Sequence, residues 1–391
     1  MSNRLVSGTG LLGIALGLIA LSAVPVASQV TANAAKSDLP RTPDGHPDLQ
    51  GIYDLATMTP LERWPGDASF LTREQADGLQ RAELDRRAKS IKGDEPRPSD
   101  RPPPPVGGIV SEPKSYFEAL EVLGGGATGG YNYFWQNKGS AYTEIAGQIR
   151  TSIIVDPPDG HPPPYNEAAR KRHATARSTP TSTAAERAAL AGVDLLALAR
   201  EYLRRGELPG AFDNPEQRPL SERCLLGFGS TSGPPALPDY FYNDLHQILQ
   251  TPDSIMILSE MIHDARIVRM NAQHLPKNIR RWMGDSVGHW EGDTLVVDTT
   301  NFTDKTRFRG STENLHVIER FTRVDDKTLL YRFTIEDADT WDRPWTGEYT
   351  WPATSKPIYE YACHEGNYAL ASVLRGARRQ ETEEAAAQAK K

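Results

Sequence analysis

The second half of the chain alternates apolar and polar residues in short runs that turn residues separate. A period of two is typical of β-strands with one buried face, and the turns predict a meander of antiparallel neighbours. We expect strands near residue 51, at 131–135, 148–155, 255–270, 294–300, 315–323 and 329–335, at Tyr349 and at 358–363. That gives about eight to ten strands, enough to close a barrel and remove its exposed edges. The predicted fold class is therefore mainly β, an antiparallel barrel.

Helical insertions interrupt this pattern. The charged and alanine-rich residues 72–91 open with a capping box, which predicts a surface helix. Residues 166–206 form a second helix-rich excursion, with a helix expected at 183–205. The proline-rich residues 94–108 can form neither a helix nor an interior strand, so we expect a stiff extended connector. The expected organisation is a single barrel domain at 36–375 and a charged, frayed tail at 376–391.

The N-terminus has the features of a signal peptide. Arg4 precedes an apolar run at 11–27, and small residues at 26–28 and 32–34 offer cleavage sites. We expect residues 1–35 to be removed and the mature protein to be periplasmic or secreted. A membrane anchor that stays attached is the alternative, because the run approaches the length of about 20 residues that spans a bilayer. No later segment is apolar enough to span a membrane.

Two cysteines, Cys224 and Cys363, are present. In an oxidising compartment an even pair predicts a disulfide bond. Two free buried thiols are the alternative.

Composition narrows the class of protein. Hydrophobic residues make up 38% of the chain, which suits a globular protein with a buried core. The formal net charge is −7 and no basic stripe is present, so a nucleic-acid partner is not expected. Composition does not predict the oligomeric state.

Several long strings resemble a large family of secreted bacterial proteins without an established activity. They are PDGHPDLQGIYD at 43–54, RTSIIVDPPDG at 150–160, RPLSERCL at 218–225, the stretch from WEGDTLVVDTTNF onward at 290–321, and YEYACHEGNY at 359–368. Gly51-Ile52-Tyr53 also resembles the Gly-x-Trp first strand of lipocalins, with tyrosine in place of tryptophan. Together with the meander, this resemblance implies a barrel of calycin or lipocalin type. It supplies no catalytic residues.

Two glycine-containing motifs occur in the wrong context for the chemistry they resemble. Residues 284–288 match Gly-x-Ser-x-Gly, but a turn and a strand follow in place of the helix that a hydrolase elbow needs. Residues 124–129 match Gly-x-Gly-x-x-Gly, but aromatic residues follow in place of a helix whose N-terminus would bind pyrophosphate. We therefore expect no organic cofactor.

Titratable residues gather on the expected strands of the second half. On 255–270 they share faces with apolar residues, a mixture that suits a ligand-lined lumen. Glu360 and His364 would likewise share a face, and a histidine beside a carboxylate titrates near neutral pH. Structural ion pairs at the barrel rim are the alternative use of such residues. The candidate acid–base residues are Glu260, His263, Asp264, Arg266, His316, Glu360 and His364.

Aromatic and polar residues near the barrel end suggest a site for a small apolar or aromatic molecule. The candidate ligand-binding residues are Trp135, Tyr242, His246, Arg309, Trp341 and Tyr361. Filling of the barrel end is the alternative role of the aromatic residues. A metal site could combine His246, His263 and His364 with Asp264 or Glu260. No recognised metal-binding spacing supports this site, so we expect no metal.

These features leave three hypotheses for function. The first is an exported enzyme that acts on a small apolar or aromatic molecule by cofactor-free acid–base chemistry, as a lyase, isomerase, hydratase or hydrolase. The alternative is a non-catalytic periplasmic binder or carrier of a hydrophobic ligand, and the second alternative is a metal-dependent enzyme with a His/carboxylate site. For the enzyme, we expect His364 in a pocket and within hydrogen-bond reach of a carboxylate. A position of His364 on the outer wall would favour the carrier.

Overall fold

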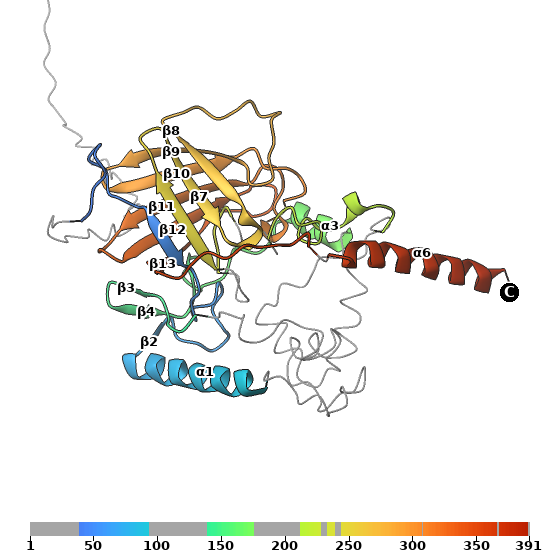
Figure 1. The fold of residues 1–391 in the computed structure, drawn as a ribbon, viewed down its shortest axis with the longest axis horizontal. Coiled ribbons are helices and arrows are strands. Elements are labelled where there is room, and N and C mark those ends of the chain that lie inside the picture. The colour runs from blue at the N-terminus through green and yellow to red at the C-terminus, as the bar shows by residue number, and fades with distance from the viewer. Residues whose placement is uncertain are drawn as a thin grey trace, which may run out of the picture. The chain divides into compact units, whose positions relative to one another are not determined.

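A ten-stranded sheet is the largest part of the fold (Figure 1). The computed structural model describes residues 39–93, 139–175, 212–227, 233–238, 244–306, 308–365 and 367–389. Across the sheet the strands are β1 (Gly51–Asp54), β6 (Leu245–Gln250), β7 (Ser254–Ser259), β8 (Ala265–Met270), β9 (Asp285–Glu291), β10 (Thr294–Thr300), β11 (His316–Arg323), β12 (Thr328–Glu336), β13 (Trp345–Pro352) and β5 (Ile154–Asp156).

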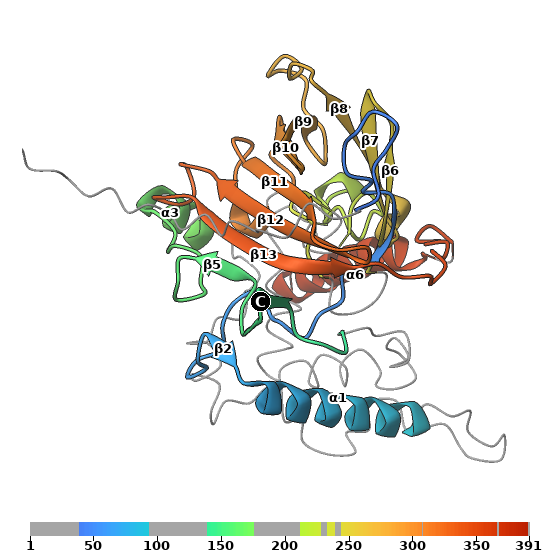
Figure 2. The same ribbon diagram turned by 90° about the vertical axis from the view of Figure 1, so that its left-hand side faces the viewer.

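The sheet curls until its two sides meet at one point (Figure 2). Neighbouring strands pair antiparallel except β8 and β9, which run parallel. Tyr53 of β1 forms an isolated bridge with Ala353, just after β13, and the Thr354 N–H donates to the Ile52 carbonyl at 2.9 Å. The prediction of a mainly β, barrel-like protein is therefore confirmed.

The alternation of side chains decides which residues line the concave face. Along β11, Val317, Glu319 and Phe321 are buried, while His316 and Arg320 point to the outer face. Neighbouring strands continue the same pattern through the register, since Phe321 pairs with Leu295 on one side and with Tyr331 on the other. Glu319 is thus a carboxylate in the otherwise apolar inward row of β11, and its burial requires a partner.

The structure corrects two of the expected strands in the region from 255 to 363. Residues 255–270 form β7 and β8 with a tight turn between them, because Ile262 and His263 adopt left-handed φ values of 62° and 49°. A β-branched residue in this conformation is a true outlier, and burial of Ile262 helps to hold it there. Residues 358–363 are not a strand, so the face that Glu360 and His364 were expected to share does not exist.

Residues outside the large sheet form a small sheet and, among the described residues, three α-helices. The small sheet has the order β2 (Phe70–Leu71), β4 (Gln148–Arg150), β3 (Glu144–Ile145), so the expected strand 148–155 is divided between β4 and β5. The helices are α1 (Arg73–Gly93), α3 (Glu167–Thr175) and α6 (Ala369–Gln388). Helix α1 confirms the prediction at 72–91. None of the described helices is long and apolar enough to cross a membrane.

The expected frayed tail is a helix. Most of 376–391 belongs to α6, in which Arg379 and Glu383 form an i,i+4 ion pair at 2.8 Å. Alanine has the highest helix propensity, and such pairs add to it, so the same composition that suggested a tail stabilises a helix. The expected signal peptide, the strand at 131–135, the connector, the helix at 183–205, and the ligand-binding candidates Trp135 and Tyr242 lie outside the described residues.

Candidate functional site

Aromatic rings from three neighbouring strands line the concave face of the large sheet. The Tyr331 ring centroid lies 4.7 Å from that of Trp351 and 5.6 Å from that of Tyr349. Phe321 meets Trp351 edge-on at 5.4 Å. All these rings are fully buried, and each pair adds about 0.5–1.5 kcal/mol beyond the burial of area. We call this surface the aromatic face; its residues are Phe321, Tyr331, Phe333, Trp345, Tyr349 and Trp351.

A glycine makes room for one of these rings. Gly347 lies between Trp345 and Tyr349 in the inward row of β13. A Cβ atom at Gly347 would lie 2.4 Å from Cζ of Phe333, a distance that no real contact permits. The missing side chain therefore allows the Phe333 ring to pack closely against β13.

A buried polar layer crosses the concave face beside the aromatic face. Arg266 of β8 donates through both terminal nitrogens to Glu319 of β11, with 2.9 Å between Nη2 and Oε1. The Tyr331 hydroxyl donates to the same oxygen at 2.8 Å. Burial opposes the charge of Arg266, but Glu319 more than offsets this effect and the pKa of Arg266 is raised. Burial also raises the pKa of Tyr331 well above its usual range, so its hydroxyl keeps its proton.

Residues 233–238 lie against this layer, inside the curl of the sheet. All six of them are buried. The N–H of Ala236 donates to the Tyr331 hydroxyl at 3.0 Å, and the Tyr349 hydroxyl donates to the Ala236 carbonyl at 3.0 Å. Two tyrosines of the aromatic face therefore hold both polar groups of one peptide residue.

Some polar atoms of the concave face are not paired. Within the described part of the chain, the indole N–H groups of Trp345 and Trp351 have no hydrogen-bond partner. A buried unpaired donor costs about 1–3 kcal/mol, so each one calls for an explanation. Both donors belong to the aromatic face.

His246, a predicted ligand-binding residue, is buried next to the aromatic face. Its Nε2 lies 2.8 Å from the Ser259 hydroxyl, and its ring centroid lies 5.5 Å from that of Trp351. Burial lowers the pKa of His246 to about 4, despite a backbone hydrogen bond with Asp244 that raises it. The ring is therefore neutral at physiological pH.

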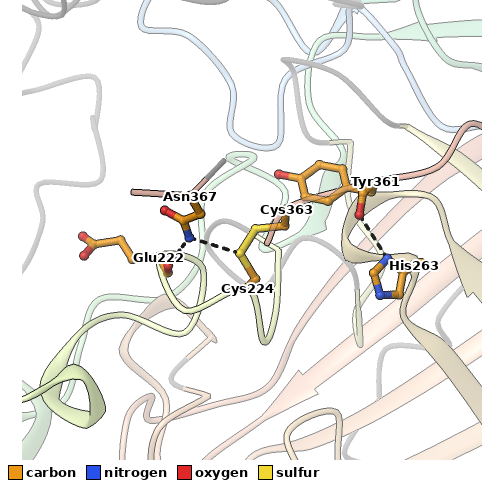
Figure 3. Close-up of a disulfide and its surroundings, with 6 residues drawn as sticks. All are labelled: Glu222, Cys224, His263, Tyr361, Cys363 and Asn367. Carbon is orange, nitrogen blue, oxygen red and sulfur yellow. Dashed lines mark hydrogen bonds between the residues drawn. A yellow bond between two sulfur atoms is a disulfide. The ribbon is translucent and has the colours of Figure 1, made fainter. Parts of the chain in front are cut away.

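The predicted disulfide bond is confirmed. Cys224 and Cys363 are bonded, with 5.7 Å between their Cα atoms (Figure 3). The Asn367 side chain donates to the Glu222 carbonyl at 3.2 Å and to Cys224 Sγ at 3.4 Å. The bridge thus fastens the segment after β13 to residues 212–227.

The disulfide segment also covers the turn between β7 and β8. Nδ1 of His263 lies 3.2 Å from the Tyr361 carbonyl, as Figure 3 shows, and Met261 and Ile262 pack with Tyr361 and Cys363. The arrangement brings His263 and Tyr361 together, but through a backbone oxygen. These contacts hold the strained turn in place.

The predicted residues around this turn do not converge on a single point. Glu260 is buried and accepts the backbone N–H of Tyr359 at 2.7 Å, which makes it a structural anchor. His364 and Glu360 are exposed, and Asp264 is half-buried. The expectation that His364 faces a pocket therefore loses its geometric basis.

Two further predicted ligand-binding residues lie in connections between strands: Arg309 between β10 and β11, and Trp341 between β12 and β13. Arg309 forms an ion pair with Glu62 and accepts a hydrogen bond from the Tyr165 hydroxyl through its carbonyl at 2.8 Å. Trp341 is buried and meets Trp345 edge-on at 5.8 Å, so it extends the aromatic face. Of the predicted ligand-binding residues that are described, His246 and Trp341 adjoin the aromatic face.

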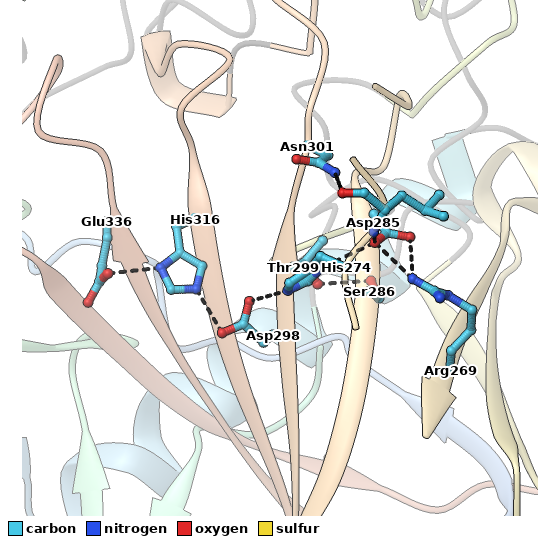
Figure 4. A network of polar contacts seen from close by, with 10 residues as sticks. Arg269, His274, Asp285, Ser286, Asp298, Thr299, Asn301, His316 and Glu336 are labelled. Carbon is cyan, nitrogen blue, oxygen red and sulfur yellow. Dashed lines mark hydrogen bonds and ion pairs between the residues drawn. The ribbon is translucent and has the colours of Figure 1, made fainter. Parts of the chain in front are cut away.

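A chain of imidazoles and carboxylates runs across the outer face of β9 to β12 (Figure 4). His316 places Nδ1 2.9 Å from Glu336 and Nε2 2.9 Å from Asp298. His274, in the segment between β8 and β9, places Nε2 2.9 Å from Asp298 and Nδ1 3.1 Å from Asp285. We call these residues, with Arg269 on Asp285 at 2.9 Å, the outer chain.

The contacts of the outer chain shift the pKa of three of its members, His316, Asp298 and Asp285, toward their charged forms. The hydrogen bond with Asp298 raises the pKa of His316, and Glu336 adds to this effect, while burial opposes it. Burial would raise the pKa of Asp298, but the hydrogen bonds and charges of His316 and His274 lower it overall. The pKa of Asp285 is lowered as well, since the Leu275 N–H, His274 and Arg269 outweigh its burial.

Few of the polar groups described above were predicted from the sequence. Of the outer chain only His316 was predicted, and of the polar layer only Arg266. Asp298 gave one signal, a charged residue that ends the apolar run 295–297. Nothing in the sequence indicated that His274 would fold back over the sheet.

Comparison with known protein families, curated proteins and solved structures gives no match. Among the described residues, no group of three or more His, Cys, Asp or Glu side chains is arranged to hold a metal ion.

Proposed function

We propose that the protein is an exported, calycin-like binder of a small, flat apolar or aromatic molecule. The observation that carries this proposal is the aromatic face, on which two tyrosine hydroxyls already hold a short segment of the chain. A ligand site combines apolar and aromatic walls with a few directed polar groups, and the aromatic face has both. The molecule would take the place of residues 233–238 on Tyr331 and Tyr349.

The unpaired indole donors give this ligand a further property. Trp345 and Trp351 each present a buried N–H without a partner among the described residues. A ligand oxygen or nitrogen that accepts from one of them would recover the cost of the unpaired donor. We therefore propose that the molecule carries at least one hydrogen-bond acceptor on an otherwise apolar frame.

Export is proposed because stable disulfides form in oxidising compartments. The bond between Cys224 and Cys363 suits the periplasm or the exterior. The resemblance of residues 1–35 to a signal peptide supports the same location.

Acid–base catalysis has less geometric support than binding. It requires at least two proton-handling groups that face one substrate. His263 contacts the disulfide segment, His316 belongs to the outer chain, and Arg266 is paired with Glu319 on the concave face. These groups lie in three different places, and His364 is exposed.

The proposal is tested by titration with N-phenyl-1-naphthylamine, a flat aromatic dye that fluoresces in apolar sites. We expect saturable binding with one dye per chain and quenching of tryptophan fluorescence. The Tyr349→Phe substitution keeps the ring but leaves the Ala236 carbonyl without its donor. The loss of one hydrogen bond, about 1 kcal/mol, should weaken the hold on residues 233–238 and raise dye affinity about five-fold.

Tyr359→Phe is the matched control, because Tyr359 is exposed and lies outside the aromatic face. We expect this variant to bind the dye with unchanged affinity. Absence of saturable binding would reject the binder. Saturable binding that Tyr349→Phe leaves unchanged or weakens would reject the displacement of residues 233–238.

A further inference from the structure

We propose that the outer chain is a pH-operated clamp, which holds residues 272–279 on the outer face of the sheet when its imidazoles are charged and releases them when they lose their protons. This inference does not depend on the proposed binding function. It rests on the geometry of two imidazoles between three carboxylates.

The number of N–H donors makes this arrangement sensitive to pH. A charged imidazole donates from both nitrogens, whereas a neutral one donates from only one and presents a lone pair at the other. His316 and His274 each have a carboxylate at both nitrogens. On deprotonation, each ring must therefore turn a lone pair toward one carboxylate, and that contact becomes repulsive.

The net charge of the outer chain also favours the charged imidazoles. The carboxylates of Asp285, Asp298 and Glu336 are balanced when Arg269, His274 and His316 are all charged. Loss of both imidazole protons leaves two negative charges in excess in a partly desolvated cluster. The raised pKa of His316 supports this reasoning, because the cluster stabilises the charged ring.

Titratable groups approach the two imidazoles from every strand that packs against them. From β8 comes Arg269, from β9 Asp285, from β10 Asp298 and from β12 Glu336. The neighbouring pair of Arg280 and Glu313, at 3.3 Å, is balanced in itself. None of these groups besides the imidazoles has an ordinary pKa between about 5 and 8.

The clamp acts on one part of the segment between β8 and β9. His274 and the Leu275 N–H, which donates to Asp285 at 2.9 Å, are fastened by the outer chain. The later part is fastened independently, since the Trp282 carbonyl accepts from Thr306 at 2.7 Å. Deprotonation would leave Leu275 held by its N–H on Asp285 and by Asn301, whose side-chain amide donates to the Leu275 carbonyl at 2.9 Å. Residues 272–279 would therefore gain mobility on loss of the His274 contacts, while β8 and β9 stay in the sheet.

The test uses a nitroxide spin label on Asn278→Cys, an exposed position. The described residues contain no free cysteine, so the label attaches at one place among them. Electron paramagnetic resonance spectra recorded from about pH 5 to about pH 9 report the mobility of this segment. We expect an immobilised label at low pH and a mobile one at high pH.

His274→Gln in the labelled protein should abolish the transition, because glutamine does not titrate. His289→Gln is the matched control: His289 pairs with Glu291 on the same outer face, is exposed, and lies outside the outer chain. It should leave the transition unchanged. Should His274→Gln fail to fold, Glu336→Gln replaces it and should lower the midpoint. A label whose mobility does not change with pH, or a transition that survives unaltered in His274→Gln, would overturn the clamp.

Discussion

Replacement of Arg266 by methionine tests whether the polar layer is part of the framework of the barrel. Methionine preserves much of the length of the arginine side chain but removes its charge and its donors. Glu319, which is 0% exposed, would then keep only the Tyr331 hydroxyl as a charge-stabilising partner among the contacts described above. Breaking a buried pair in this way costs about 3–5 kcal/mol, because one charge is left buried without compensation.

The assay is urea unfolding followed by tryptophan fluorescence, which reports on the aromatic face directly. Arg320→Met is the matched control. Arg320 follows Glu319 in β11, but it points to the outer face and pairs with Glu291 at 2.7 Å. An exposed pair of this kind contributes about 0–1 kcal/mol. The double variant Arg266→Met, Glu319→Leu should recover most of the lost stability, because it leaves no buried charge.

The loss of stability in Arg266→Met should also depend on pH. A buried, unpaired carboxylate has a raised pKa, so Glu319 in Arg266→Met should take up a proton on folding. The stability deficit of the variant should therefore shrink as the pH falls toward about 5. A loss of stability no larger than that of Arg320→Met, or a double variant weaker than Arg266→Met, would refute the assignment of the pair as a structural unit.

Other predictions concern the covalent bond, the packing and the electrostatics. The bond between Cys224 and Cys363 spans a sequence separation of 139 residues, so its reduction should lower the free energy of unfolding by roughly 4–5 kcal/mol in the chain-entropy model. Urea unfolding with and without reductant measures this difference, and equal midpoints would contradict it. Gly347→Ala should lower the free energy of unfolding by about 1–3 kcal/mol or more, because the added Cβ would overlap the Phe333 ring. An unchanged melting temperature would contradict this packing. The pKa of His316 is raised by folding, so its stabilising effect is fully present below about pH 6.5 and is lost as the pH rises through the folded-state pKa. The stability difference between wild type and His316→Gln should therefore shrink on going to alkaline pH, and a difference that grows would reverse the sign.

The sequence was most informative where local pattern decides structure. The run from Thr294 to Thr300 forms β10 with the predicted ends, because a turn at 291–293 precedes residues that are rich in β-branched side chains. The disulfide was predicted because only two cysteines are present. The interruption at Ile262 could not be seen, since an isoleucine with positive φ gives no local signal and depends on tertiary packing.

The functional groups were predicted less well for a related reason. Analysis of residues 255–270 as one strand assigned Arg266 to a mixed face, but its partner Glu319 lies 53 residues further along the chain. The pairing of His316 with Glu336 depends on the register between β11 and β12, which the turn fixes only once both strands exist. Whether a candidate residue joins a site is therefore decided by contacts with residues that are distant in the sequence.

The most direct test of the account follows the methyl group of Ala236 by NMR. In protein labelled with ¹³C at alanine methyl groups, the Ala236 signal, assigned with an Ala236→Ser sample, reports the position of residues 233–238 between Tyr331 and Tyr349. Saturating N-phenyl-1-naphthylamine should shift this signal, because the methyl leaves the ring currents of the aromatic face, while the buried methyl of Ala76 in α1 stays in place. A bound dye with an unmoved Ala236 signal would contradict the claim that the aromatic face is the binding site.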